Sequence, residues 1–256
     1  MMSEMVQTTI VTALFKGSDY GVPHSQNIYD ATWVDKLYNG CKRNSTIPFE
    51  MVCLVDRQYD IQAPVRQIPF QSQPDKTAGW ALLTEVYRPD LTDGPRLTIG
   101  LDTIICSNID CYLQMDIPFA MVTDPFSFIV PSFENEVCNA MTWCDSASAE
   151  RVWHTWTNEQ DWIRKHCILA PWNTISEMVL LRKIFNADGN VPRIDMLHPG
   201  IYSYKCHILN QEELVFADNL KIVYFHGTPK PNDLQMHPDA FPEFDVVNKA
   251  ILKHWV

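Results

Sequence analysis

The residues best suited to chemistry in this chain lie near its C-terminus, where an apolar run ends in a histidine, a glycine and a lysine. The run Ile222-Val-Tyr-Phe is followed by His226, Gly227 and Lys230, with a proline on each side of the lysine. Histidine can ligate a metal, lysine places a point charge against phosphate, and glycine lets the backbone approach a ligand closely. The segment therefore predicts a loop that holds a metal-bound diphosphate, although similar Gly and Pro patterns also occur in ordinary surface turns.

The elements that must position this loop begin with a strand, a helix and a second strand. Residues 7–15 are rich in β-branched and apolar types and predict a buried first strand. Asp30 then predicts the N-cap of an amphipathic helix that is expected to end at Gly40. Residues 50–55 predict the second strand. This order favours an α/β fold with a parallel sheet.

Two further predicted strands each meet an aspartate. One covers residues 96–106 and is interrupted at Gly100-Leu101-Asp102, and the other covers residues 119–123 and is followed by Asp124. An open sheet places its ligand crevice at such strand ends, so both aspartates are expected there. The other expected elements are a strand at 137–143, helices at 79–87, 148–156, 158–167 and 178–185, and a capping box at 174–177.

The composition predicts one ordinary globular domain. The chain has 256 residues, of which 46% are hydrophobic and 20% charged, enough to bury one large core. Its net charge of −11 disfavours nucleic-acid and anionic-membrane surfaces. Neither a signal peptide nor a run approaching the ~18 apolar residues of a membrane helix is found, so a soluble, cytoplasmic protein is expected. The eight cysteines lie singly, which favours buried free thiols over disulfides or zinc.

A set of ordered motifs covers most of the chain. They are VTALFKGSDYG, LYNGCKRN, MVCLVD, GWALLTEVYRP, RLTIGLDTIICSNID, VCNAMTW, NEQDWI, HPGIYSYKCH and IVYFHGTPKPNDL. In this order they resemble the nucleotide-diphospho-sugar glycosyltransferases of the A-type fold, particularly the small bacterial and phage members. The resemblance implies a single Rossmann-like domain over residues 1–256, with a mainly parallel central sheet flanked by helices. It also implies a nucleotide-binding half at about 1–125 and an acceptor half with the phosphate loop at about 126–256.

The family carries an Asp-x-Asp motif that binds a divalent metal and the sugar-nucleotide. The corresponding residues here are Gly100, Leu101 and Asp102, so the first acidic position is lost. The resemblance implies Mn²⁺ or Mg²⁺ on Asp102 and His226, because phosphates and waters can fill the other positions around a hard cation. A lysine that is usual in relatives is replaced by Leu83. These departures leave open an altered donor, a reduced metal dependence or a loss of activity.

Other positions that match family motifs are expected to bind the donor or to act in the reaction. Asn139 is expected to line the sugar pocket, and Glu159 and Gln160 are expected to face the transferred sugar as catalytic residues. Both catalytic candidates also fit an exposed first helical turn, where the helix dipole favours an acid. The remaining donor-binding positions that the resemblance implies are Thr12, Ala13, Asp56, Leu101, Asp102, Ser203, Lys205, Gly227 and Lys230.

The implied reaction transfers a sugar from a nucleotide-diphosphate donor, expected to be a UDP-sugar, to a hydroxyl acceptor. A metal on Asp102 and His226, helped by Lys230 and the Gly227 amide, would neutralise the charge that grows on the leaving diphosphate. The acceptor is left open among a small molecule, a glycan, a protein and modified DNA. Two alternatives also stay open: a phage-type enzyme that glycosylates hydroxymethylated pyrimidines in DNA, and a non-catalytic nucleotide-sugar binder.

Overall fold

The centre of the protein is a six-stranded sheet in the order β3-β2-β1-β4-β7-β6, seen in a computed structural model that describes residues 7–20, 28–72, 76–169, 173–237 and 242–256. Its strands are β1 (Thr9–Leu14), β2 (Glu50–Val55), β3 (Arg66–Pro69), β4 (Arg96–Ile99), β6 (Phe119–Thr123) and β7 (Val137–Cys144). The pairs β3/β2, β2/β1 and β1/β4 are parallel, and the pairs β4/β7 and β7/β6 are antiparallel. The predicted α/β fold with a mainly parallel sheet is confirmed.

A smaller sheet lies beside the central one. It has the order β10-β11-β5, with β10 (Ile201–Ser203), β11 (Ile222–Tyr224) and β5 (Thr103–Ile105). Strands β10 and β11 are parallel, and β11 and β5 are antiparallel. The turn at residues 100–102 carries the chain from β4 into β5, so the interruption predicted within residues 96–106 is a change of sheet. A short antiparallel ribbon is formed by β8 (Ile168–Leu169) and β9 (Thr174–Ile175).

Both faces of the central sheet are buried, because successive side chains of a strand point to opposite faces. In β1, Ile10 and Leu14 belong to one apolar cluster, whereas Val11 belongs to the other. Helix α1 (Ala31–Arg43) contributes to the first cluster, and α3 (Ser146–Asn158) contributes to the second. Two layers of apolar packing therefore hold the ends of the central strands in place.

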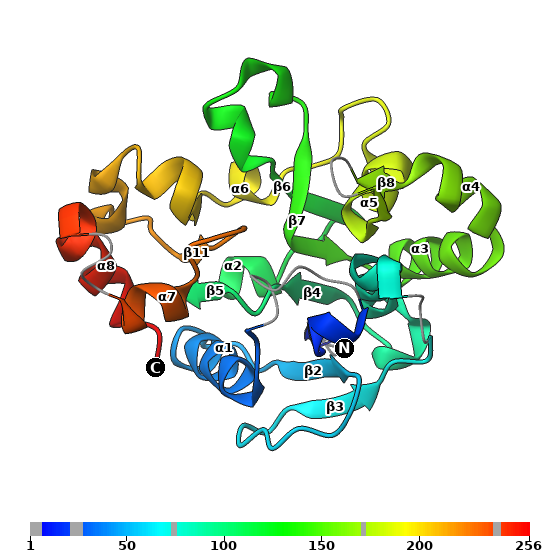
Figure 1. The fold of residues 1–256 in the computed structure, drawn as a ribbon, viewed down its shortest axis with the longest axis horizontal. Coiled ribbons are helices and arrows are strands. Elements are labelled where there is room, and N and C mark those ends of the chain that lie inside the picture. The colour runs from blue at the N-terminus through cyan, green and yellow to red at the C-terminus, as the bar shows by residue number, and fades with distance from the viewer. Residues whose placement is uncertain (1–6, 21–27, 73–75, 170–172, 238–241) are drawn as a thin grey trace, which may run out of the picture.

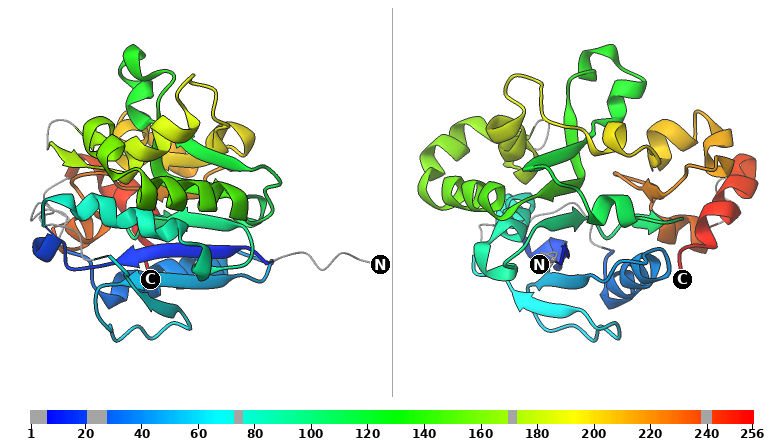
Figure 2. Two further views of the ribbon diagram at one scale, coloured as in Figure 1. Left: turned by 90° about the vertical axis from the view of Figure 1, so that its right-hand side faces the viewer. Right: turned by 180° about the vertical axis from the view of Figure 1, so that it is seen from behind.

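The longer helices gather in two groups on either side of the central strands (Figure 1, Figure 2). One group has α3, α4 (Gln160–His166) and α5 (Glu177–Phe185), and the other has α1, α7 (Pro231–Met236) and α8 (Asp245–Leu252). The short helix α2 (Asp110–Leu113) follows β5, and α6 (Ile194–Leu197) precedes β10. The predicted flanking of the sheet by helices is confirmed.

Helix α1 begins as predicted and ends later than predicted. Asp30 is its N-cap and accepts a hydrogen bond from the backbone N of Thr32 (2.9 Å). The helix continues past Gly40 to Arg43. A Cβ on Gly40 would lie 3.3 Å from Cβ of Ile105, so this glycine allows close packing of α1 against β5 and does not end the helix.

The segment before α5 also differs from the prediction. Thr174 and Ile175 form β9, and Ser176 caps α5 without a side-chain hydrogen bond. The predicted capping box is therefore wrong, because its acidic residue, Glu177, is buried and directed inwards. The helix predicted at 79–87 is part of a 3₁₀ segment, Lys76–Tyr87.

Two features concern the chain as a whole. All eight cysteines are free thiols, and seven of them are buried. No helix among the described residues is long and apolar enough to span a membrane.

The predicted division of the chain near residue 125 stays a prediction. Strand β7, which lies beyond residue 125, belongs to the central sheet and pairs with β4. Gly21, the last residue of the first motif, lies outside the described residues.

Candidate functional site

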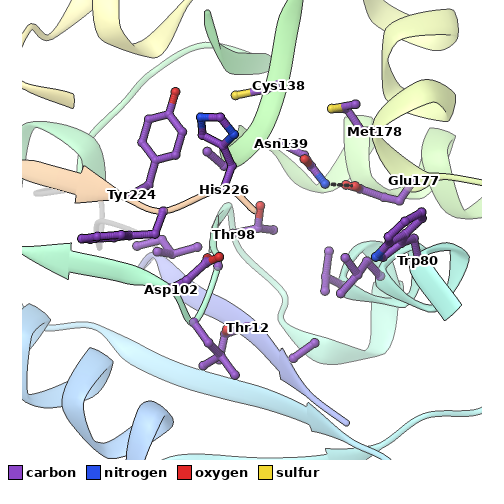
Figure 3. A pocket seen from close by; sticks show the side chains of 18 of the residues that line it. Thr12, Trp80, Thr98, Asp102, Cys138, Asn139, Glu177, Met178, Tyr224 and His226 are labelled. Carbon is purple, nitrogen blue, oxygen red and sulfur yellow. Dashed lines mark hydrogen bonds between the residues drawn. The ribbon is translucent and has the colours of Figure 1, made fainter. Parts of the chain in front are cut away.

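A cavity of about 400 Å³ opens where the ends of the central strands meet the small sheet. Its wall combines residues that are far apart in the sequence: the end of β1, the 3₁₀ segment, the turn after β4, the middle of β7, the start of α5 and the loop after β11 (Figure 3). The polar side chains that line it are Thr12, Tyr29, Trp80, Thr98, Asp102, Asp124, Asn139, Glu177, Tyr224, His226 and Lys230. The predicted crevice at strand ends is thus present, with both Asp102 and Asp124 in its wall.

One side of the cavity carries a buried ion pair. Nζ of Lys230 donates to the carboxylate of Asp102 and to the carbonyl O of Phe225, the latter at 2.8 Å. Oδ2 of Asp102 also accepts a hydrogen bond from the hydroxyl of Tyr29 (3.1 Å). The backbone N of Lys230 donates to Oδ2 of Asp233 (2.8 Å), which fixes the start of α7. Hydrogen bonds therefore fix both the backbone and the side chain of Lys230.

His226 lies beside this pair and faces the cavity (Figure 3). Its Nε2 lies 2.9 Å from Oγ of Ser203 and 3.5 Å from Sγ of Cys206. Burial, reinforced by the positive charges of Lys205 and Lys230, lowers the pKa of His226 to about 4. The imidazole is therefore neutral at physiological pH and acts as a hydrogen-bonding group there.

The opposite side of the cavity carries a buried carboxyl group, that of Glu177. Nδ2 of Asn139 donates to its Oε2, and the hydroxyl of Tyr87 donates to its Oε1 (3.0 Å). Figure 3 shows Glu177 and Asn139 joined on one side of the cavity, with Asp102 and His226 on the other. Burial raises the pKa of Glu177 to about 7 although both hydrogen bonds oppose the shift. Such a group can gain or lose a proton near neutral pH.

No protein-family model and no curated protein matches the chain. Solved structures do match it. LgtC, a galactosyltransferase solved with donor and acceptor sugar analogues, has a TM-score of 0.58 and 9% identity over 95% of this chain and 96% of LgtC. GlyE of Streptococcus pneumoniae TIGR4 has a TM-score of 0.58 and 13% identity, and the bifunctional glycosyltransferase WbbM has 0.58 and 11%.

The chain has the glycosyltransferase A-type fold. The match to GlyE covers 97% of this chain and 63% of GlyE, and the match to WbbM covers 96% of this chain and 52% of WbbM. It therefore spans about half of WbbM and less than two thirds of GlyE. At these identities the likeness concerns the fold, and the chemistry of the cavity must be derived from the residues of this chain.

Within the A-type fold, most of the predicted donor-binding positions come together. Thr12, Ala13, Leu101, Asp102, Asn139, Gly227 and Lys230 all line the cavity, while Ser203 and Lys205 lie just behind it. His226, predicted as a metal ligand, lines the cavity as well. Leu83, where the resemblance implies a lysine, is also in the wall. Thr12 Oγ1 is buried and has no hydrogen-bond partner among the described residues.

Asp56 is not in the cavity wall. Its carboxylate accepts hydrogen bonds from Nη2 of Arg57 (2.6 Å), the hydroxyl of Tyr59 (2.7 Å) and the backbone N of Lys16 (3.2 Å). These neighbours occupy both carboxylate oxygens. Asp56 therefore connects the loops after β1 and β2 and does not lie in the donor cavity.

The predicted catalytic pair is not in the cavity wall either. Glu159 is exposed at the junction of α3 and α4, and the side chain of Gln160 donates to the carbonyl O of Trp156 in the preceding helical turn. The motif lies at the break between two helices, and the structure does not bring the pair into the cavity, so its catalytic role stays a prediction. Glu177 joins Asp102 and Asp124 as an acid in the cavity wall, and its signal in the sequence was an acid that opens an otherwise apolar helix.

The cavity wall offers few ligands for the divalent metal that the resemblance implies. Among the residues that the structure describes, no group of three or more His, Cys, Asp or Glu side chains could hold a metal ion. The Asp102 carboxylate is paired with Lys230, and Gly100 adds no second carboxylate beside it. These residues by themselves do not fit Mn²⁺ or Mg²⁺, and no chemical step below uses the predicted metal on Asp102 and His226.

Proposed function

We propose that this chain is a glycosyltransferase that takes a sugar from a nucleotide-diphosphate donor, with UDP as the nucleotide. The observation that supports the proposal is one cavity with two unlike polar sides: the Lys230 ammonium on one, and Glu177 with Asn139 on the other. A nucleotide sugar has the same division into an anionic diphosphate and a neutral sugar. The two sides face one cavity, whose wall also includes residues at the ends of central strands.

In the proposed complex, the nucleoside lies against the end of β1, where Thr12 offers its unpaired hydroxyl. The diphosphate lies toward Lys230 and the backbone amide of Gly227. The sugar lies toward Asn139 and Glu177. This assignment uses the charge of each group and its place in the cavity wall.

The reaction breaks the bond between the anomeric carbon and a diphosphate oxygen and forms a bond from that carbon to an acceptor oxygen. Negative charge grows on the leaving diphosphate, and the fixed Lys230 ammonium stabilises it without a large reorganisation. Positive charge grows at the anomeric carbon, and the ionised carboxylate of Glu177 favours it. The proton of the acceptor hydroxyl must also leave, and the pKa of about 7 makes Glu177 a suitable acceptor for it.

A thermal-shift screen with UDP-, GDP- and TDP-sugars tests the proposal. A ligand that binds only the native state raises stability by RT ln(1 + [L]/Kd), about 2.7 kcal/mol at a hundredfold excess over Kd. We expect a nucleoside diphosphate and its sugar to raise the melting temperature, and we expect the protein to hydrolyse the sugar donor slowly in the absence of an acceptor. If no nucleotide at millimolar concentration shifts the transition, the proposal is refuted.

A second function, nucleotide-sugar binding without catalysis, is favoured by two positions in the cavity wall. Gly100 and Leu83 stand where relatives carry an acid and a lysine. Donor hydrolysis separates this alternative from the enzyme, because a pure binder would be stabilised by the donor and leave it intact. Glycosylation of modified DNA finds no support in the charge of −11, and a mobility-shift assay with hydroxymethylated DNA tests it.

A further inference from the structure

A buried positive charge lies beside the position predicted for a metal. Lys230 is 2% exposed, and its Nζ donates to the Asp102 carboxylate and to the carbonyl O of Phe225. Its backbone N is bonded to Asp233. A lysine on a surface loop would be mobile and hydrated, whereas this ammonium has a fixed place and direction in the cavity wall.

The oxygens of the Asp102 carboxylate are largely occupied by other contacts, so few lone pairs remain for a divalent ion. Its Oδ2 accepts hydrogen bonds from Lys230 and from Tyr29. Its Oδ1 faces Gly100, where an added Cβ would lie 2.9 Å from that oxygen. A metal on Asp102 would meet the ammonium as a like charge at short range, with no second carboxylate to offset the repulsion. The glycine at residue 100 and the ammonium of Lys230 therefore both disfavour a divalent ion at Asp102.

Lys205 brings a second positive charge to the same place. Its Nζ lies 3.3 Å from the point where a Cβ on Gly227 would be. Gly227 has φ of +65°, so it adopts the left-handed conformation and leaves this space open. Two ammonium groups together carry the charge of one divalent cation.

We propose that Lys230, assisted by Lys205, takes the place of the divalent metal, so that this chain binds the diphosphate of its donor without a metal ion. The inference rests on the proposed function, since the diphosphate belongs to the donor of that reaction. An ammonium has three N–H donors. Asp102 and Phe225 use two of them, and the third has no hydrogen-bond partner among the described residues, which leaves it for a diphosphate oxygen. When the anomeric bond breaks, its electron pair moves to that oxygen, where the ammonium stabilises it.

Calorimetric titration of UDP tests the inference on the purified protein, once with a chelator and once with millimolar Mn²⁺. We expect Kd values that agree within about twofold in the two conditions. Lys230→Met removes the charge and keeps an apolar chain of similar length. In chelator, this variant should bind UDP at least about tenfold more weakly. Mn²⁺ should restore part of that loss, because the variant leaves the Asp102 carboxylate without its cation.

Lys249→Met is the matched control. Lys249 is an exposed lysine that also pairs with an aspartate, Asp245 (2.7 Å), outside the cavity wall. Its substitution should leave the Kd for UDP unchanged. A circular-dichroism melt confirms that each variant is folded. If Lys230→Met does not fold, Lys205→Met replaces it, and this variant should also bind UDP more weakly than the wild type in chelator.

The outcomes separate the inference from the proposed function. If the wild-type protein binds UDP only with Mn²⁺, the metal-free inference is overturned and the glycosyltransferase proposal stands. If a folded Lys230→Met variant binds UDP in chelator as tightly as the wild type, the inference is also overturned. If the wild type binds no nucleoside diphosphate in either condition, the proposed function itself fails.

Discussion

Replacing Glu177 by Gln tests whether a buried, titrating carboxyl group lies in the cavity. Burial raises the pKa of Glu177 from its ordinary value of 4.5 to about 7. At about 1.4 kcal/mol per pH unit, this difference corresponds to about 3 kcal/mol of native-state stability. Between these two values the folded protein binds more protons at Glu177 than the unfolded chain does, so stability falls as pH rises through this window. Above about pH 7 the loss is complete.

The Gln side chain keeps the shape of the protonated acid and cannot ionise. At about pH 4.5, Glu177→Gln and the wild type should therefore have free energies of unfolding within about 1 kcal/mol of each other, the size of one hydrogen bond. At about pH 8 the variant should be more stable by about 3 kcal/mol. Urea denaturation at a series of pH values measures both quantities. A difference between the two proteins that stays constant across this range would refute the burial and titration of Glu177.

The same variant tests the role of Glu177 in the reaction. Donor hydrolysis by Glu177→Gln should be slower by about a hundredfold or more, with little change in the Kd for UDP, because the amide can neither accept a proton nor carry the charge. Wild-type hydrolysis should fall as pH decreases below about 7, where the carboxylate becomes protonated. Glu159→Gln is the matched control at an exposed site, and it should change stability by less than about 0.5 kcal/mol and leave hydrolysis unaffected.

Three other substitutions test the cavity wall, each by urea denaturation and by calorimetric titration of UDP. Thr12→Val removes a buried hydroxyl that has no partner, so stability should stay equal or rise by about 1 kcal/mol while UDP affinity falls. Gly227→Ala should cost about 1 kcal/mol, because φ is +65°, and should weaken UDP binding by crowding Lys205. His226→Ala should lower stability by about 1 kcal/mol through the lost bond to Ser203 and weaken UDP binding; unchanged binding would leave His226 a structural role only.

Local sequence patterns predicted the buried central strands, whose residues are mostly apolar, but not the edge strand β3 (Arg66–Pro69). The predicted second strand matches β2 (Glu50–Val55), and residues 119–123 match β6 (Phe119–Thr123). The glycine in α1 misled the prediction, since a glycine at a helix end and one at a close helix–strand contact look alike in sequence. Only the position of β5, which comes from elsewhere in the chain, separates the two interpretations.

The candidate site was predicted only in part, because local patterns indicate some of its residues and contacts from elsewhere in the chain bring in the others. Strand ends and the loop after β11 indicated Asp102 and His226, whereas Tyr29 carried no recognisable motif and Glu177 matched only a capping box. Glu177 had a sufficient local explanation as a helix-capping residue, so its burial could not be inferred from its neighbours. Whether an acid at the start of a helix faces water or a cavity depends on what packs against that helix, here the 3₁₀ segment that brings Tyr87.

The pairing of Asp102 with Lys230 follows from backbone register. Strand β5 is antiparallel to β11, with Thr103 opposite Tyr224, so the residue before β5 meets the residue after β11. The backbone N of Phe225 accordingly donates to the carbonyl O of Asp102 (2.9 Å). The loop that starts there carries the ammonium of Lys230 back to the Asp102 carboxylate across 128 residues of sequence. Hydrogen bonds between two strands thus set the place of the cation, and they would hold Asp102 in the same place if the lysine were removed. That is why a freed carboxylate in Lys230→Met should remain available to Mn²⁺.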